Sequence, residues 1–315
     1  MTVAVLDTGV AYAARGGLLP SPDFAPRTFV KGVDLCAHDA QVLACRGRDE
    51  FPEDRNGHGT HVAGTIAEAT GNGIGLTGLA YGARTMPVKV LNSHGDGDEE
   101  TIAKGIRYAA KAGVDIINLS LEFNAGTVAG EIPDIIDALA YAGWRGVLVV
   151  GAAGNQAATA VAYPARAAGV LSVGATTEHG CVASFSNQGT RLDVVAPGGG
   201  EDAPGLTGDA ICHPSPDRGR DIFQLTYRSP TDRRFDYPDG YEGTSMAAPA
   251  VSATAALVIA AGVLGSKPRP EAIMGRLEAT ARDLGPPGAD RRYGAGLIDA
   301  GAATDPAVPV TPAGV

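Results

Sequence analysis

The chain has 315 residues, of which 44% are hydrophobic and 19% are charged, and its formal net charge is −10. This composition is that of an ordinary globular protein, long enough to bury a sizeable α/β core. The negative charge and the absence of any basic run argue against a nucleic-acid-binding surface. The 44 glycines favour many tight turns and a site built from loops.

Short apolar runs alternate with helical patterns along the chain. Strands are predicted at 3–6, 85–91, 115–119, 147–150 and 170–173, and helices at 61–69, 101–112, 132–141 and 246–262. This alternation predicts the fold class: α/β, with a three-layer, doubly wound and mostly parallel sheet that carries helices on both faces. Ligands bind at the carboxyl ends of such strands, and Asp7, Ser120 and Asn155 each follow a predicted strand.

No internal repeat and no linker divides the chain, so we expect a single domain over 1–305. Residues 198–240, rich in Gly, Pro and Asp, are interpreted as a surface insertion, and 306–315 as a flexible tail. The chain opens inside a predicted strand, and residues 1–20 lack the pattern of a signal peptide. We therefore expect that an N-terminal segment is missing from this form.

Cysteines and apolar runs indicate the compartment. The four cysteines form two sequence-local pairs without CxxC spacing, and they are Cys36, Cys45, Cys181 and Cys212. They favour two disulfides over a metal site, with the connectivity left open, and disulfides suit an oxidising compartment. The nearly uncharged stretch 247–265 contains a proline, a serine and a threonine, so we expect a buried core helix and no membrane span.

The stretch DRNGHGTHVAGTIAEA places His58 and His61 at the start of a predicted helix. It lacks the HExxH pattern of a zinc protease, which disfavours a metal. His58 fits a general base if a carboxylate holds its ring and a hydroxyl lies within reach; otherwise it is a capping or packed residue. His61 is interpreted as structural support.

Ser245 lies in GTSMAAP, directly before an apolar helical run. Such a serine is either an N-cap or a nucleophile raised on a tight turn. All six histidines precede it, which excludes the α/β-hydrolase order, in which the nucleophile comes first and the histidine last.

Two further motifs support weaker hypotheses. The D-T-G at Asp7 could belong to an aspartic protease, but the chain has no second D-T-G or D-S-G, so this remains a less favoured alternative. GNGIGLTG contains a dinucleotide fingerprint at Gly73, Gly75 and Gly78, but it follows a predicted helix and precedes a strand, the reverse of what phosphate binding requires.

Four motifs taken together resemble those of the subtilase (subtilisin-like serine protease) family. They are VAVLDTGV, NGHGTHVAGTIA, VVGAAGN and GTSMAAP, and with INLSL and YGAGLIDA the similarity extends from residue 3 to about 303. The order aspartate, histidine, serine is that of subtilisin. The resemblance implies the family's fold and endopeptidase activity, and it aligns His58 rather than His61 with the catalytic histidine.

The resemblance also implies residue roles. Ser245 would be the nucleophile that forms an acyl-enzyme, His58 the base and then the acid, and Asp7 the carboxylate that orients the imidazole. Asn155 and the Ser245 N–H would form the oxyanion hole. Polypeptide substrates would add as a strand, with broad specificity, and the expected binding residues are Leu91, Gly95, Ser120, Leu121, Glu122, Ala153, Gly154, Gln156 and Ala162.

Glu122 stands where the family usually has glycine. We hypothesise that it favours basic substrate residues, together with acids on a nearby loop, namely Asp96, Asp98, Glu99 and Glu100. The alternative is a solvated acidic surface.

Calcium is the cofactor that the resemblance implies, for stability only, and the chemistry needs no cofactor. The candidate ligands are Asp23 and the oxygen-lined turn that follows the predicted helix, with Thr70, Asn72, Ile74 and Leu76. In the family the site also takes a ligand from the extreme N-terminus, which this form lacks.

These observations favour an active, secreted and monomeric endopeptidase that acts on polypeptides, with its own missing pro-segment as an inhibitor. The alternative from another class is a catalytically inert scaffold of the same fold, or a truncated inactive form. The set of Asp7, His58, Asn155 and Ser245 favours the enzyme, because a binding module has no physical need for all four.

Overall fold

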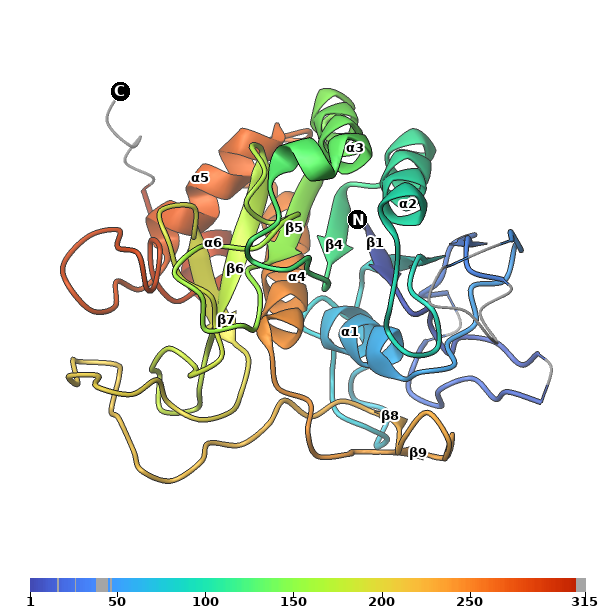
Figure 1. The fold of residues 1–315 in the computed structure, drawn as a ribbon, viewed down its shortest axis with the longest axis horizontal. Coiled ribbons are helices and arrows are strands. Elements are labelled where there is room, and N and C mark those ends of the chain that lie inside the picture. The colour runs from blue at the N-terminus through green and yellow to red at the C-terminus, as the bar shows by residue number, and fades with distance from the viewer. Residues whose placement is uncertain (16, 26, 38–44, 46, 310–315) are drawn as a thin grey trace.

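The computed structural model describes residues 1–15, 17–25, 27–37, 45 and 47–309. Its centre is a seven-stranded sheet in the order β2-β3-β1-β4-β5-β6-β7, with every pairing parallel (Figure 1). The strands are β1 (Thr2–Asp7), β2 (Val33–Asp34), β3 (Arg84–Lys89), β4 (Ile116–Leu119), β5 (Leu148–Ala152), β6 (Val170–Thr176) and β7 (Val194–Pro197). The last six residues of the predicted tail, 310–315, lie outside the described residues.

Helices cover both faces of this sheet. One face packs against α1 (His58–Ala67), α4 (Thr244–Ala261), α5 (Pro270–Thr280) and α6 (Ala300–Thr304). The other packs against α2 (Glu99–Ala112) and α3 (Pro133–Trp144), which lie side by side in Figure 1, with the short 3-10 helix η1 (Ala129–Glu131) before α3. The predicted α/β class with helices on both faces is confirmed.

The strand sequences explain the two cores. In β1, Val3 and Val5 belong to the α1 and α4 side, whereas Ala4 and Leu6 belong to the α2 and α3 side. Successive side chains of a strand point to opposite faces, so a strand buried on both sides reads as an unbroken apolar run. This is why the first residues of the chain could be recognised as a buried strand.

Among the predicted boundaries that differ from the structure, two lie beside the site, and their causes are not contained in a local pattern. The apolar run 85–91 continues past the end of β3, because the N–H groups of Val90 and Leu91 turn onto the Asp7 carbonyl oxygen at 2.9 and 3.1 Å. The helix predicted at 61–69 begins three residues earlier, at His58. In both places, backbone that the prediction had assigned differently lies at the carboxyl edge of the sheet.

The helix α4 is the centre of the larger core. By length and composition it could cross a membrane, but 72% of its apolar window is buried inside the protein. Its buried face is made largely of alanines, and it contacts β4, β5, β6 and β7. Small side chains let a helix lie close to the sheet, so the N-terminus of α4 reaches the carboxyl edge without a long connection.

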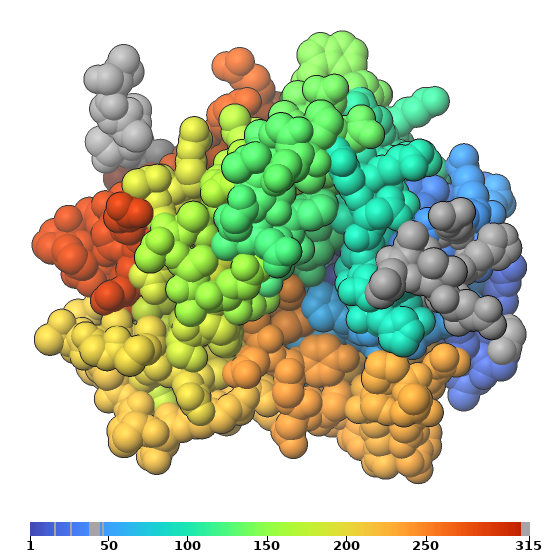
Figure 2. Space-filling view, viewed as in Figure 1, coloured from blue at the N-terminus to red at the C-terminus, as the bar shows by residue number. Residues whose placement is uncertain are grey.

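The segment 198–243 covers the lower edge of the molecule, coloured yellow to orange in Figure 2. It contains the antiparallel pair β8 (Thr226–Tyr227) and β9 (Phe235–Asp236). It is held to α1 by His61, whose Nε2 donates to the Ile222 carbonyl at 2.9 Å and whose ring stacks on Tyr241 at 4.2 Å. Burial lowers the pKa of His61 to about 3, so the ring is neutral and acts as packing.

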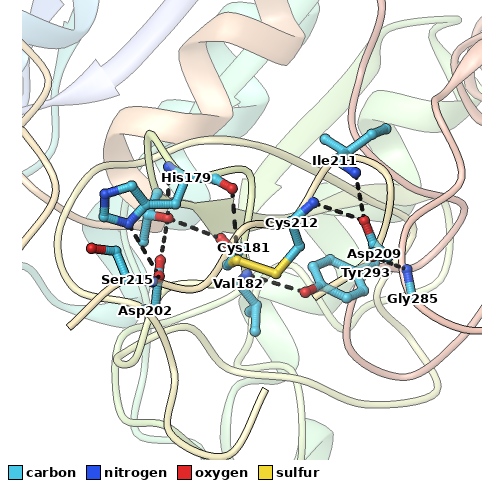
Figure 3. The surroundings of a disulfide bond; sticks show 11 residues. His179, Cys181, Val182, Asp202, Asp209, Ile211, Cys212, Ser215, Gly285 and Tyr293 are labelled. Atoms are coloured by element: carbon cyan, nitrogen blue, oxygen red, sulfur yellow. Dashed lines mark hydrogen bonds and ion pairs between the residues drawn. A yellow bond between two sulfur atoms is a disulfide. The ribbon is translucent and has the colours of Figure 1, made fainter. Parts of the chain in front are cut away.

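Two disulfides join the sequence-local cysteine pairs, Cys36 with Cys45 and Cys181 with Cys212, and the prediction of two bridges is confirmed. The second bridge anchors the 198–243 segment to the turn after β6 (Figure 3). Beside it the Asp202 carboxylate accepts from His179 at 3.1 Å and from the Ser215 N–H at 2.8 Å. These contacts hold the covering segment against the sheet.

Candidate active site

The predicted site residues meet at the carboxyl edge of the central strands. A cleft of about 400 Å³ opens there. Its lining comes from the N-termini of α1 and α4 and from the segments that follow the strands, and it includes His58, Ser120, Glu122, Asn155 and Ser245. A larger hollow of about 1130 Å³ lies beside α2, but the described residues that line it include neither serine nor histidine. The smaller cleft is therefore the candidate active site.

The buried carboxylate of Asp7 holds the ring of His58. Asp7, at the end of β1, is fully buried, and its Oδ1 lies 2.8 Å from His58 Nδ1 and accepts from the Thr8 N–H at 2.7 Å. Burial lowers the pKa of His58, but the charge and hydrogen bond of Asp7 outweigh it, so the pKa is raised overall. With Nδ1 held by the carboxylate, Nε2 is the ring nitrogen left to accept a proton.

Close approach of α1 to β1 requires glycine. A Cβ at Gly59 would collide with the Gly9 carbonyl and would lie 3.1 Å from the Asp7 side chain. Gly57, directly before the helix, adopts a φ of 111°, which disfavours other residues. The glycines of NGHGTH thus let the histidine reach the end of the first strand.

Asp54 organises the turn that leads into α1, and the sequence reasoning missed it. Its Oδ1 accepts from the Thr8 hydroxyl at 3.0 Å and from the Asn56 and Gly57 N–H groups at 2.9 Å each. Its Oδ2 accepts from the N–H and the hydroxyl of Thr60 at 3.0 and 2.6 Å. One buried carboxylate therefore satisfies five donors from β1, the turn and the helix. The only signal in the sequence was an aspartate four residues ahead of the histidine.

Ser245 lies in the first turn of α4 and is tied to the end of β4. Pro249 has no N–H to donate to the Ser245 carbonyl, the usual partner four residues back. The Ser120 hydroxyl donates to that carbonyl instead at 2.8 Å, and it accepts from Asn118, whose amide oxygen accepts from Ser252. The Ser245 hydroxyl itself donates to the Ser120 carbonyl at 3.2 Å. This network fixes where Ser245 sits on the sheet edge.

Asn155 is oriented by the residue before Ser245. Its Oδ1 accepts from the Thr244 N–H at 2.8 Å and from the Thr244 hydroxyl at 3.0 Å. The same hydroxyl accepts from the Gly154 N–H at 3.1 Å. Because both bonds occupy the amide oxygen, the amide nitrogen is the group left to donate, and the Glu122 carboxylate lies within its reach. Thr244 was not among the predicted site residues.

The Glu122 side chain bridges the two segments that flank the serine. Its carboxylate accepts from the Asn155 N–H at 2.9 Å and from the Gln156 amide at 3.4 Å, and it touches Gly154 closely enough to exclude a Cβ there. Burial raises the pKa of Glu122, and the hydrogen bonds from Asn155 and Gln156 oppose this only in part.

The remaining predicted binding residues divide into two groups. Five of the nine line the cleft: Leu91, Gly95, Ser120, Leu121 and Glu122. Ala153, Gly154 and Ala162 are buried behind it, and Gln156 is exposed at its rim. Asn187, which the sequence reasoning missed, shapes this wall, because its side chain accepts from the Gln156 and Ala158 N–H groups and donates to the Ala153 carbonyl.

Of the four loop acids that were expected beside Glu122, only Asp96 lines the cleft. Asp98 caps α2 by accepting from the Thr101 N–H at 2.8 Å, Glu99 accepts from the Asp134 N–H at 2.8 Å, and Glu100 pairs with Lys104. These three acids serve the start of α2 and its contact with α3. The charge that faces the cleft is therefore smaller than the sequence suggested.

The calcium candidates lie near the C-terminal end of α1. Asp23 is fully buried, and its Oδ2 has no hydrogen-bond partner among the residues described. Asn72 donates its amide to Asp23 Oδ1 at 2.6 Å, and a Cβ at Gly75 would collide with Asp23 Oδ2. Thr70, Ile74 and Leu76 belong to the partly exposed turn around them. An orphaned buried carboxylate oxygen beside such a turn fits a hard cation, although the described chain gathers no group of three His, Cys, Asp or Glu.

Comparisons with known proteins agree with this architecture. Residues 1–296 match the model of the subtilase family. The chain is 36% identical over 306 residues to subtilisin Savinase of Lederbergia lenta, a match that covers 96% of this chain and 90% of that protein. It is also 36% identical to an alkaline protease of Shouchella clausii, and that match covers 63% of the other protein. A solved structure of a protease from Pseudoalteromonas arctica PAMC 21717 has a TM-score of 0.77 and 30% identity, over 96% of this chain and 89% of that one.

These matches identify the class of protein, which is a serine peptidase, a hydrolase. Within that class the chain belongs to the subtilase family. The resemblance carried by the four sequence motifs is therefore confirmed.

Thr244→Val tests whether the Thr244 hydroxyl positions Asn155. The substitution removes one of the two donors to the amide oxygen and leaves the Gly154 N–H without its acceptor. We therefore expect kcat to fall about tenfold, the scale of one hydrogen bond, with KM nearly unchanged. Steady-state hydrolysis of a peptide substrate measures this. Thr254→Val is the matched control, since Thr254 lies on the same helix and bonds only within it. Equal kcat values for the two variants would contradict the role.

Proposed function

We propose that this protein is a serine endopeptidase in which Ser245 attacks the peptide carbonyl and forms an acyl-enzyme. The observation that carries the proposal is the buried Asp7–His58 pair at 2.8 Å, in the same cleft as Ser245. A carboxylate that holds Nδ1 directs Nε2 toward a nucleophile, which is the arrangement that acyl transfer needs.

In the first step, the Ser245 hydroxyl rotates from the Ser120 carbonyl toward His58 Nε2, which takes its proton as Oγ attacks. Asp7 keeps the ring in the reactive tautomer and stabilises the imidazolium that forms. His58 then gives the proton to the leaving amine, and an acyl-Ser245 ester remains. In the second step His58 takes a proton from water while the water oxygen attacks the ester carbon. The bond between that carbon and Ser245 Oγ then breaks, and Oγ takes the proton from His58.

The negative oxygen of each tetrahedral intermediate would be held by the Asn155 amide nitrogen and the Ser245 N–H. The orientation of Asn155 by Thr244 supports this assignment, because the amide oxygen is already occupied. The N-terminus of α4 adds a positive field at the same place. These donors are built before substrate arrives, so little reorganisation opposes the reaction.

Substrate would pair as an added strand with the backbone at Ser120–Glu122 and at Ala153–Gly154. Glu122 would favour a basic side chain in the residue before the cut, because its carboxylate spans the space between these two segments. Asp96 would add to the same field from the opposite rim.

The same proposal covers the organisation of the protein. Residues 1–305 would form one peptidase domain, with 198–240 as an insertion that packs on α1, and the enzyme would be a monomer inhibited by a pro-segment until cleavage. The two disulfides support secretion into an oxidising compartment. Calcium would be structural, held by Asp23 and the turn at 70–76.

An aspartic protease built on Asp7 has less support. Its chemistry needs a second carboxylate that shares a proton with the first. Within the described part of the chain, the hydrogen bonds of Asp7 go to an imidazole and to a backbone N–H. Labelling of the nucleophile distinguishes an enzyme from an inert scaffold of the same fold.

Labelling by a fluorophosphonate tests the nucleophile. We expect the probe to form one adduct, mapped by mass spectrometry to Ser245, and Ser245→Ala to lose both the adduct and casein hydrolysis. Ser266→Ala is the control, because Ser266 is exposed beyond the C-terminal end of α4 and lies outside the network that holds Ser245. A folded protein that takes no label would favour the scaffold.

Glu122→Gln tests specificity. We expect the ratio of kcat/KM for peptides with Arg and with Leu before the cut to fall about fivefold, the scale of about 1 kcal/mol for a partly solvated charge pair. Glu201→Gln, at an exposed site, should leave the ratio unchanged. If Glu122→Gln also leaves it unchanged, the carboxylate is part of the wall and does not select the substrate.

A further inference from the structure

Three buried side chains near the C-terminal end of α1 have oxygen atoms without hydrogen-bond partners among the described residues. They are both carboxylate oxygens of Glu68, Oδ2 of Asp23 and Oε1 of Gln224. Glu68 and Asp23 are 0% exposed and Gln224 is 7% exposed. Glu68 is the C-cap residue directly after α1, whereas Asp23 lies between β1 and β2 and Gln224 lies in the segment that covers α1.

Two sets of contacts place these three residues around the end of α1. The N–H of Ala69 donates to the Asp23 carbonyl at 2.8 Å, which sets Asp23 beside the residue that follows Glu68. A Cβ at Gly64 would lie 3.1 Å from Glu68 Oε1 and 3.4 Å from Gln224 Cβ, so these two side chains meet over that glycine. Three separate parts of the chain therefore place oxygen-bearing side chains around the end of α1.

Two carboxylates in such a place repel each other. Glu68 and Asp23 are both buried, and the negative charge of each acts on the other. A buried carboxylate without a counter-charge destabilises the folded state. A bound cation would remove both the repulsion and the unsatisfied oxygens.

The chemistry of the pocket selects the cation. Carboxylate and amide oxygens with neighbouring backbone carbonyls are the ligands of Ca²⁺, which takes six to eight oxygens in flexible geometry. No histidine or thiol is among these donors, which disfavours zinc. The turn at 70–76, next to Asp23, offers further oxygens, because Asn72 already contacts the Asp23 carboxylate.

We propose that Glu68 and Gln224 are calcium ligands together with Asp23, so that the ion joins the end of α1 to the segment that covers it. The family resemblance pointed to Asp23 and the turn at 70–76, but not to these two residues. An ion held in this way would fix the far end of the helix that presents His58. The proposal concerns binding and stands whether or not the catalytic assignment holds.

Calcium titration of the full chain, stripped with EDTA, tests the proposal by calorimetry. We expect wild type to bind calcium, and Glu68→Gln to bind it at least about tenfold more weakly, because the number of charged ligands sets the affinity. Glu271→Gln, which removes one charge from an exposed position of α5, should bind as wild type does. Calcium should also raise the Tm of wild type by more than that of Glu68→Gln.

Three results would overturn the proposal. Wild type that binds no calcium would remove its basis, and Glu68→Gln with wild-type affinity would show that Glu68 is no ligand. The Tm of Glu68→Gln could also fall below that of wild type by the same amount in calcium and in EDTA. That result would show that Glu68 is protonated and makes a purely structural hydrogen bond. If Glu68→Gln does not fold, Gln224→Met decides, since it keeps size and charge: several-fold weaker calcium binding supports the proposal, and unchanged binding refutes it.

Discussion

The buried pair of Asp7 and His58 is the interaction around which the rest of the molecule is arranged. A carboxylate at the end of the first strand is stable there only if it is paired, and the pairing requires the N-terminus of α1 to lie almost against that strand. Gly59 permits the approach, and Asp54 holds the turn that delivers the histidine. The charge of Asp7 in turn keeps the pKa of His58 above its usual range despite burial.

Placement of the serine depends on a second constraint, the position of α4. A helix rich in alanine packs closely on the sheet, and Pro249 leaves the Ser245 carbonyl to the Ser120 hydroxyl. The end of β4 and the start of α4 are thereby joined, and Thr244 extends the connection to Asn155 on β5's side of the cleft. Hydrogen bonds between neighbouring strand ends thus bring residues more than a hundred positions apart into one site.

Much of this could be predicted from the sequence, because it is written in local patterns. Unbroken apolar runs indicated the buried parallel strands, and four motifs in a fixed order indicated the family. The hydrogen-bond partners of the site residues could not be predicted, because they come from distant segments of the chain. No local pattern in the sequence indicates the five hydrogen bonds to Asp54 or the hydrogen bonds from Thr244 to Asn155. The same holds for the proximity of Glu68 and Gln224. For the same reason Asp98, Glu99 and Glu100 were expected at the cleft, although the start of α2 uses them.

The central claim is that Asp7 acts through His58 on Ser245, and the pH dependence of Ser245 acylation by a fluorophosphonate tests it most directly. Only neutral His58 can take the proton, so the rate in wild type should rise with pH through a midpoint above 6.5, the usual pKa of histidine, since the pKa of His58 is raised. Asp7→Asn should lower the rate at high pH by a factor on the order of 10⁴, because the ring loses its reactive tautomer. A profile and rate unchanged by Asp7→Asn would contradict the account.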